Sequence, residues 1–251
     1  MSVFTILYRN VKWRFHNSFT IVITILQPLL WLVLYSAVAG QTMKNTEIEN
    51  YTAFILPGLV VLVSFSACSS SGIMNYMMKS DGSFYRVLIA PVRRSSIVLG
   101  QLLEAVLCTF IEVGIMCAVS LFFSVAIAAD MAGIFIIIFL VFLTAFFMAG
   151  LAYGISLILP NEVVYETVMN AIVLPVFFLS TALFPADSIS GVLGAAININ
   201  PFTHMINVLR ELILYGTVQI SSLIFVLMLF VVMGGIGFIW ALHGLKKELD
   251  L

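Results

Sequence analysis

Six stretches of this sequence are each long and apolar enough to cross a lipid bilayer as a helix. A spanning helix needs about 20 predominantly apolar residues, and the stretches lie at about 18–39, 53–77, 95–125, 132–159, 166–184 and 220–242. The composition agrees, since 62% of the residues are hydrophobic and only 9% are charged, against roughly 45–50% and 25% in soluble domains. The sequence therefore predicts an all-α integral membrane protein with six transmembrane helices, built as a single domain over 1–251.

Lysine and arginine are distributed unevenly between the two sides that six crossings define. If the N-terminus is cytoplasmic, nine of the eleven basic residues fall on the cytoplasmic side, namely Arg9, Lys12, Arg14, Lys79, Arg86, Arg93, Arg94, Lys246 and Lys247. Lys44 and Arg210 fall on the other side. Cytoplasmic loops of membrane proteins carry such an excess of positive charge, so we expect both termini in the cytoplasm.

The sequence contains no motif typical of an enzyme or of a metal site. It lacks the glycine-rich P-loop that binds nucleotides and the histidine–glutamate motif of zinc proteases. Cys68, Cys108 and Cys117 all fall in apolar stretches without a C-x-x-C spacing, which favours small core residues over a disulfide or a metal site. We therefore expect a non-catalytic chain that binds no metal and no cofactor, and that has no nucleic-acid partner.

Residues 1–17 precede the first apolar stretch and have the pattern of an amphipathic helix. One side of this helix is apolar at helical spacing and the other is basic: Phe4, Leu7, Tyr8, Val11 and Phe15 against Arg9, Lys12 and His16. Together with Trp13, this pattern suits a helix that lies in the headgroup plane of the membrane. The alternative is a simple cytoplasmic extension of the first span.

Two glutamates lie within the third apolar stretch, where a charge is costly. Glu104 and Glu112 belong to a stripe with four-residue spacing, which places them on one broad face of a helix. Ionisable side chains in membrane helices face protein or water rather than lipid. Two interpretations remain open: a polar patch that lines a substrate path or holds a proton, or an interhelical hydrogen-bonded pair with a structural role.

Residues 185–217 lie outside by the charge distribution and are still mostly apolar, so a plain solvated loop is not expected. Asp187 or Ser188 can cap a first short helix that runs to about Ile197, and Asn200 can cap a second that starts at Pro201. We predict a re-entrant helical hairpin in the outer leaflet, because backbone at that depth must be helical or covered by protein. Its candidate functional residues are Pro185, Asn200, Pro201, Thr203 and Arg210.

Residues 79–96 lie between the second and third apolar stretches and combine charge with apolar side chains. Asp81-Gly82 is a turn signal, Ser83 can cap a short helix over 83–90, and Pro91 stops it. Phe84, Val87 and Leu88 form an apolar face. A loop that only keeps charge in the cytoplasm does not need this face, so we predict a short helix that presents apolar anchors to a protein partner.

The order and spacing of three motifs resemble those of ABC type 2 exporter membrane subunits, in the branch of daunorubicin-type drug and nodulation-factor permeases. The motifs are SDGSFYRVLIAPVRRSS at 80–96, LFP at 183–185, and NPFT at 200–203 followed by Arg210. Family members often carry a Glu-Arg-Glu-like cluster before the glycine turn. In this chain NYMMKSDG takes its place and Asp81 is the only acidic residue.

The resemblance implies a permease in a prokaryotic cytoplasmic membrane that works with two separate ATPase subunits. ATP and Mg²⁺ would bind to those partners, and a second copy of this chain or a homologous permease would complete the membrane part. The helix over 83–90 would be the coupling helix that docks on the ATPase. Its coupling residues would be Ser83, Phe84, Arg86, Val87, Leu88, Pro91, Arg93 and Arg94.

The expected activity is ATP-driven export of a hydrophobic or amphipathic substrate, such as a drug, a lipid or a lipid-like molecule. We favour this class because the spans offer few polar groups. The alternatives are export of a polysaccharide, a lipid-linked glycan or a peptide on the same scaffold, or a secondary transporter that works without ATP. The last would be supported by inverted repeats, and the sequence has no convincing three-plus-three repeat.

Overall fold

The computed structural model describes residues 3–16, 18–42, 51–123, 125–184 and 191–248, and this part of the chain is helical with no strand. The helices are α1 Val3–His16, α2 Ser18–Thr42, α3 Tyr51–Ser80, α4 Ser83–Leu88, α5 Arg94–Ser120, the short 3₁₀ helix η1 Leu121–Phe123, α6 Met131–Ile158, α7 Glu162–Phe178, α8 Gly191–Ile199, α9 Pro201–Tyr215 and α10 Ile220–Lys247. The prediction of an all-helical protein is confirmed for the described residues.

Each of the six predicted apolar stretches coincides with a helix, namely α2, α3, α5, α6, α7 and α10. Among the described residues, four helices are long and apolar enough to cross a membrane: α3, α5 with its 3₁₀ extension, α6 and α10. Within α2, Val22–Ala37 is the apolar segment whose side chains the structure describes, and α7 has 17 residues. The chain therefore has the architecture of a helical membrane protein.

The structure corrects the bounds of the fifth predicted stretch. Helix α7 begins at Glu162 rather than near 166, because the side chain of Asn161 accepts a hydrogen bond from the Val164 amide at 2.9 Å and caps the first turn. It ends at Phe178 rather than near 184. The side chain of Asn200 donates to the carbonyls of Val176 and Leu179, both at 2.7 Å, and so satisfies carbonyls at the end of the helix.

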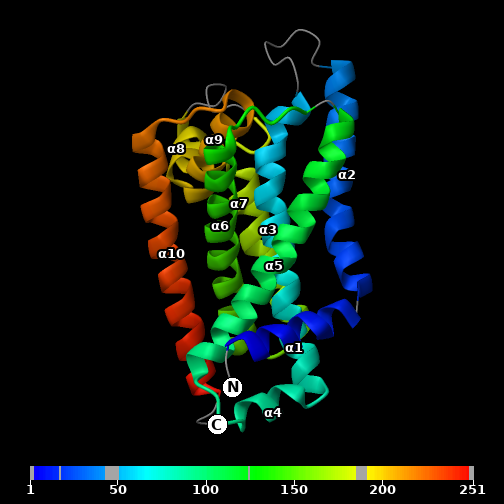
Figure 1. Ribbon diagram of the computed structural model, residues 1–251, viewed down its shortest axis with the longest axis vertical. Helices are drawn as coiled ribbons and strands as arrows, with labels where there is room; N and C mark the ends of the chain where they lie inside the picture. The colour runs from blue at the N-terminus through cyan, green and yellow to red at the C-terminus, as the bar shows by residue number, and fades with distance from the viewer. Residues whose placement is uncertain (1–2, 17, 43–50, 124, 185–190, 249–251) are drawn as a thin grey trace.

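Helix α3 lies at the centre of the molecule, and the other long helices run along the same axis around it (Figure 1). It contacts α2, α4, α5, α6, α7 and α9. Its side chains are buried along almost the whole length. Helix α10 packs mainly on α6 and leaves most of its surface uncovered.

The contact between α6 and α10 depends on glycine. A Cβ atom added to Gly150 would lie 2.9 Å from the carbonyl carbon of Gly237, a distance that real Cβ atoms do not reach. Small residues allow membrane helices to approach this closely. The G-x-x-x-G spacing of Gly150 and Gly154 therefore serves helix packing within this chain.

The short helices occupy the two ends of the molecule. Helix α1 lies across one end of the bundle, beside the lower part of α5, and α4 lies at the same end, where α10 also finishes (Figure 1). Helices α8 and α9 lie at the opposite end (Figure 1). This separation defines two ends of the bundle, at which the candidate functional residues other than Glu104 and Glu112 are found.

Candidate functional site

The turn between α3 and α4 is built by Asp81 and Gly82. Gly82 has a φ of 73° and occupies the position before the helix, a left-handed conformation that favours glycine. The carboxylate of Asp81 accepts a hydrogen bond from the Ser83 amide at 2.8 Å. Hydrogen bonds from Ser83 lower the pKa of Asp81 below its ordinary value. Ser83 is thus the first residue of the helix, and the prediction that it caps the helix is wrong.

Helix α4 is shorter than predicted, because it ends at Leu88 rather than near Ala90. Its inner face consists of Phe84 and Leu88, which are only 4% and 6% exposed and pack in the core of the chain. Arg94, at the start of α5, donates to the Leu88 carbonyl at 2.8 Å. The helix is therefore fastened to the rest of the chain at both ends.

The outward face of α4 differs from the predicted one. Phe84 and Leu88 pack against their own chain, so they are not free to anchor a partner, because burying them removes apolar area from water. Tyr85 and Ile89 are 56% and 84% exposed, and Arg86 is exposed between them. Val87 is half-buried, whereas Pro91 and Arg93 are exposed on the connection to α5.

Lys79 joins three elements at this end of the molecule. Its ammonium group lies 2.5 Å from a carboxylate oxygen of Glu248, just after α10, and 5.3 Å from the ring centroid of Phe84. The first contact is an ion pair and the second a cation–π contact. Lys79, at the end of α3, thus holds both the C-terminal end of α10 and the first turn of α4.

A buried ion pair connects α1 to α5. A guanidinium nitrogen of Arg14 lies 3.1 Å from a carboxylate oxygen of Glu104, and both side chains are almost fully buried. Arg14 also donates to the Ser70 hydroxyl at 2.8 Å, and the Ser71 hydroxyl donates to the second carboxylate oxygen of Glu104 at 2.8 Å. Each charge is therefore paired and hydrogen-bonded, as a buried charge requires.

The polar contacts of α1 extend beyond this pair. The Asn10 amide donates to Gln101 at 2.9 Å, and the Gln101 amide donates to the Ser71 hydroxyl at 3.1 Å. Asn10, Arg14, Gln101 and Glu104 are all buried. We call Asn10, Arg14, Ser71, Gln101 and Glu104 the polar cluster. It fixes α1 across the lower part of the bundle.

Glu112 lies about two turns further along α5 than Glu104 and is also fully buried. One of its carboxylate oxygens accepts a hydrogen bond from the Thr24 hydroxyl of α2 at 2.8 Å. Its other oxygen is buried and has no hydrogen-bond partner among the described residues. Of the two open interpretations, the geometry therefore gives Glu104 a structural partner and leaves Glu112 with one unused acceptor.

The second helix of the predicted hairpin is observed with the predicted start. Asn200 caps α9 by accepting from the Phe202 amide at 3.0 Å, with Pro201 in the first turn, and Gly216 follows its last residue. Helix α8, Gly191–Ile199, takes the place of the first helix. Pro185 and the two proposed caps, Asp187 and Ser188, lie outside the described residues.

Arg210 ties α9 to two other elements. It donates to the carbonyls of Phe54 in α3 and of Thr181 after α7, and its guanidinium carbon lies 3.9 Å from the ring centroid of Phe54. Thr203 is buried, and its hydroxyl has no partner among the described residues. Arg210 therefore holds α9 against the bundle instead of facing solvent.

The polar cluster was not predicted from the sequence, although a signal for it is present. Ile6, Asn10 and Arg14 follow one another at four-residue spacing and form the buried side of α1. Glu104 lies on a matching stripe of α5. One stripe carries an arginine and the other a glutamate. Because both charges must be shielded from lipid, Arg14 and Glu104 are candidates for an ion pair.

Known proteins with similar sequences include several named as transport permeases. The family model described as "ABC-2 type transporter" matches residues 1–214. The protein named transport permease ycf38 in Cyanophora paradoxa is 29% identical over 215 residues, which is 84% of this chain and 73% of that protein. Nodulation protein J of Rhizobium meliloti (strain 1021) is 23% identical over 216 residues, covering 81% of this chain and 78% of that protein. The chain therefore belongs to the ABC-2 type transporter family and is a membrane permease of that type.

Proposed function

We propose that this permease is the membrane subunit of an ATP-driven exporter, and that α4 is the helix through which ATPase subunits act on it. The observation that carries the proposal is the position of α4. It is a short helix at the end of the bundle, with Phe84 and Leu88 packed inward and Tyr85, Arg86 and Ile89 directed outward. An exposed apolar pair beside an arginine is typical of a surface that fits a groove on a partner protein.

Two further features support a role for α4 in transmitting movement. The helix is attached to α3 through Lys79 and to α5 through Arg94. A push on α4 would therefore reach the centre of the bundle through two long helices at once. We propose two ATPase subunits, which bind ATP and Mg²⁺, and a second permease subunit, so that each permease engages one ATPase.

The proposed topology has six crossings, made by α2, α3, α5, α6, α7 and α10, with both termini in the cytoplasm of a prokaryotic cell. Helices α1 and α4 and the last turn of α10 lie at one end of the bundle (Figure 1). An even number of crossings fits this arrangement. Helices α8 and α9 would then form the outer hairpin and border the exit for the substrate.

The proposed substrate is hydrophobic or amphipathic, such as a drug, a lipid or a lipid-like molecule, and it leaves the cytoplasm or the inner leaflet. The buried polar side chains of the described bundle are mostly engaged with one another, as in the polar cluster, or with backbone carbonyls. Few of them remain for a strongly polar cargo. Reconstituted complexes should therefore show ATP hydrolysis that amphipathic compounds stimulate more strongly than free sugars do.

The docking role of α4 is tested by Tyr85→Asp combined with Ile89→Asp. We expect a tagged variant to reach the membrane in normal amounts and to lose most of the Mg²⁺-dependent ATPase that co-purifies with the wild-type chain. Loss of two exposed anchors typically weakens an interface by about 2–4 kcal/mol, or roughly 30- to 1,000-fold.

The matched control is Tyr215→Asp, which changes an exposed aromatic residue at the end of α9, on the other side of the molecule. It should retain the ATPase. Unchanged ATPase recovery and export in the α4 variant would show that this helix is not the docking element. Loss in both variants would indicate damage to the permease instead of to the docking surface.

A further inference from the structure

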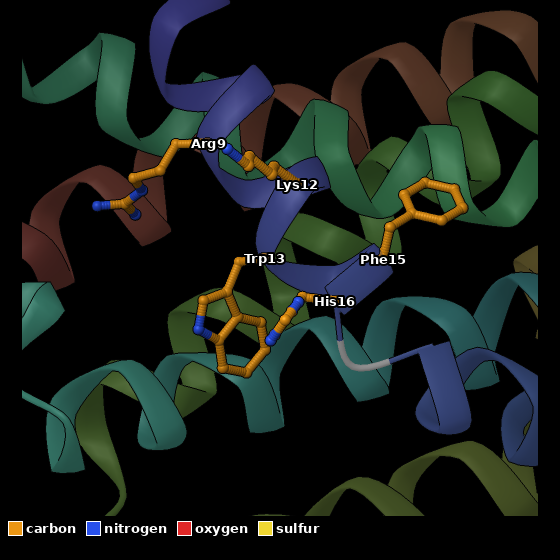
Figure 2. Close-up of a pocket in the computed structure, with 5 residues that line it drawn as sticks. All are labelled: Arg9, Lys12, Trp13, Phe15 and His16. Carbon is orange, nitrogen blue, oxygen red and sulfur yellow. The ribbon is translucent and has the colours of Figure 1, made fainter.

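One side of α1 forms an open hollow of about 490 Å³, lined by Arg9, Lys12, Trp13, Phe15 and His16. Figure 2 shows these five side chains and places the rings of Trp13 and His16 next to each other. Three of the five carry or can carry a positive charge. Nothing in the proposed transport mechanism uses them.

Within the described part of the chain, no residue of the hollow forms an ion pair, and the one acidic charge that acts on Arg9 is that of Asp81. The ion pairs there are Arg14–Glu104 and Lys79–Glu248, and neither includes a residue of the hollow. Arg14 turns inward to Glu104, whereas Lys12 and His16 are exposed. No aspartate or glutamate precedes Glu47 in the sequence. The hollow is therefore a local excess of positive charge.

The hollow also offers hydrogen-bond donors that are free to bind a ligand. Lys12, Trp13 and His16 make no hydrogen bond to another described residue. The guanidinium group of Arg9 is directed at the Asn10 side chain and the Met78 sulfur, with contacts at 2.8 and 3.4 Å. Ammonium, indole N–H and imidazole N–H groups are the donors that a phosphate oxygen accepts.

The neighbouring surface is apolar. Phe4, Tyr8 and Phe15 are 78%, 70% and 50% exposed, and Phe4, Tyr8, Lys12 and His16 follow one another at four-residue spacing along one stripe of the helix. Aromatic side chains at this density suit the boundary between headgroups and acyl chains. A free phosphate ion would make no apolar contact with these aromatic side chains, whereas a phospholipid has both a phosphate group and acyl chains.

From this combination we infer that the α1 hollow binds the phosphate headgroup of an anionic membrane phospholipid. Lys12 and His16 face the phosphate, Trp13 donates from its indole nitrogen, and the exposed aromatic residues contact the acyl chains. The site holds α1 at the membrane surface from outside, as the polar cluster holds it from inside.

The test is native mass spectrometry of the purified full chain, titrated with dioctanoylphosphatidylglycerol or dioctanoylphosphatidylcholine. We expect phosphatidylglycerol to bind at least about tenfold more tightly than phosphatidylcholine. A basic residue near a membrane surface contributes about fivefold to binding of anionic lipid. Lys12→Gln combined with His16→Gln should therefore weaken phosphatidylglycerol binding by about five- to thirtyfold.

The matched control is Lys246→Gln combined with Lys247→Gln, which removes charge from two exposed residues at the same end of the molecule. Its binding should stay within about twofold of wild type. Equal weakening by both double variants would overturn the site in favour of net charge alone. Equal binding of the two lipids would overturn it as well. Full competition by inorganic phosphate at the lipid's own concentration would reassign the hollow to a free anion.

Discussion

At the scale of single residues, the two glutamates of α5 have different surroundings although they share one helix face. Glu104 is matched by the guanidinium of Arg14 and by the Ser71 hydroxyl. Glu112 has only the Thr24 hydroxyl, and its second oxygen has no partner in the described structure. The sequence could place both carboxylates on one face. It could not reveal the partners, which come from α1, α2 and α3.

Glu104→Gln should destabilise the permease strongly. The change leaves the Arg14 charge buried without a counter-charge, and breaking a buried pair in this way typically costs about 3–5 kcal/mol. Thermal unfolding in detergent micelles measures the loss. Replacing both residues by methionine should recover much of the stability, because the unpaired charge is then gone. A single variant as stable as wild type would contradict the role of this ion pair.

Glu112→Gln should leave thermal stability close to that of wild type, because glutamine keeps the shape and can still accept from Thr24. If Glu112 lines the substrate path or holds a proton, export by the assembled complex should fall at normal protein levels. Export at the wild-type rate would instead assign Glu112 to packing, so a transport assay beside the unfolding curve separates the two interpretations.

At the scale of the elements, the sequence predicted the positions of the helices more reliably than it predicted which side of each helix is buried. The caps of α7 and α9 are visible as asparagines at their starts, and the cap of α9 was predicted correctly. For α4 the apolar face was correctly found at Phe84 and Leu88. The direction in which this face points was not predicted, because it depends on how α4 packs against the ends of α3 and α5. A helix this short can present its apolar side to a partner or to its own chain, and the periodicity is the same.

The attachment of α4 through Lys79 can be dissected by charge reversal. Glu248→Lys removes the ion pair alone, whereas Lys79→Glu removes both the ion pair and the cation–π contact with Phe84. Partly exposed pairs contribute up to about 1 kcal/mol, so hydrogen exchange of the α4 amides should accelerate about two- to fivefold in Glu248→Lys and further in Lys79→Glu.

Combining the two reversals restores the ion pair but not the cation–π contact, so exchange in the double variant should return only part of the way. Lys246→Glu reverses a nearby charge outside the pair and should leave α4 unchanged. Equal exchange rates in all four variants would mean that Lys79 does not hold α4.

At the scale of the whole molecule, the arrangement of the helix ends makes the proposed topology measurable. Single cysteines are introduced at Arg86 on α4 and at Tyr215 on α9, in a chain whose Cys68, Cys108 and Cys117 are replaced by alanine. A membrane-impermeant maleimide added to intact cells should label position 215, and it should label position 86 only after permeabilisation. Labelling of both positions in intact cells would contradict placement of α4 in the cytoplasm.

The whole-molecule arrangement was the part least accessible from the sequence. The lengths of the apolar stretches predicted the helical segments, and the resemblance to exporter permeases predicted the family. The central position of α3, however, follows from contacts with six other helices. Helix α3 carries six serines against two in α10, but this difference does not by itself show that α3 is surrounded by other helices and that α10 is mostly uncovered. Hydrophobicity alone cannot distinguish a helix surrounded by protein from one surrounded by lipid.

The burial of α3 has a mechanical consequence. Because α3 contacts six other helices, it would not tilt without displacing them. A load applied to its end would therefore be shared by all six. Near that end, Gly82 has a φ of 73° and open space where a Cβ would stand, so the turn requires glycine for its backbone conformation and not for lack of room, while Lys79 links α3 to the first turn of α4. If α4 receives the load in the proposed mechanism, α3 is therefore the element that would carry it to the far end of the molecule.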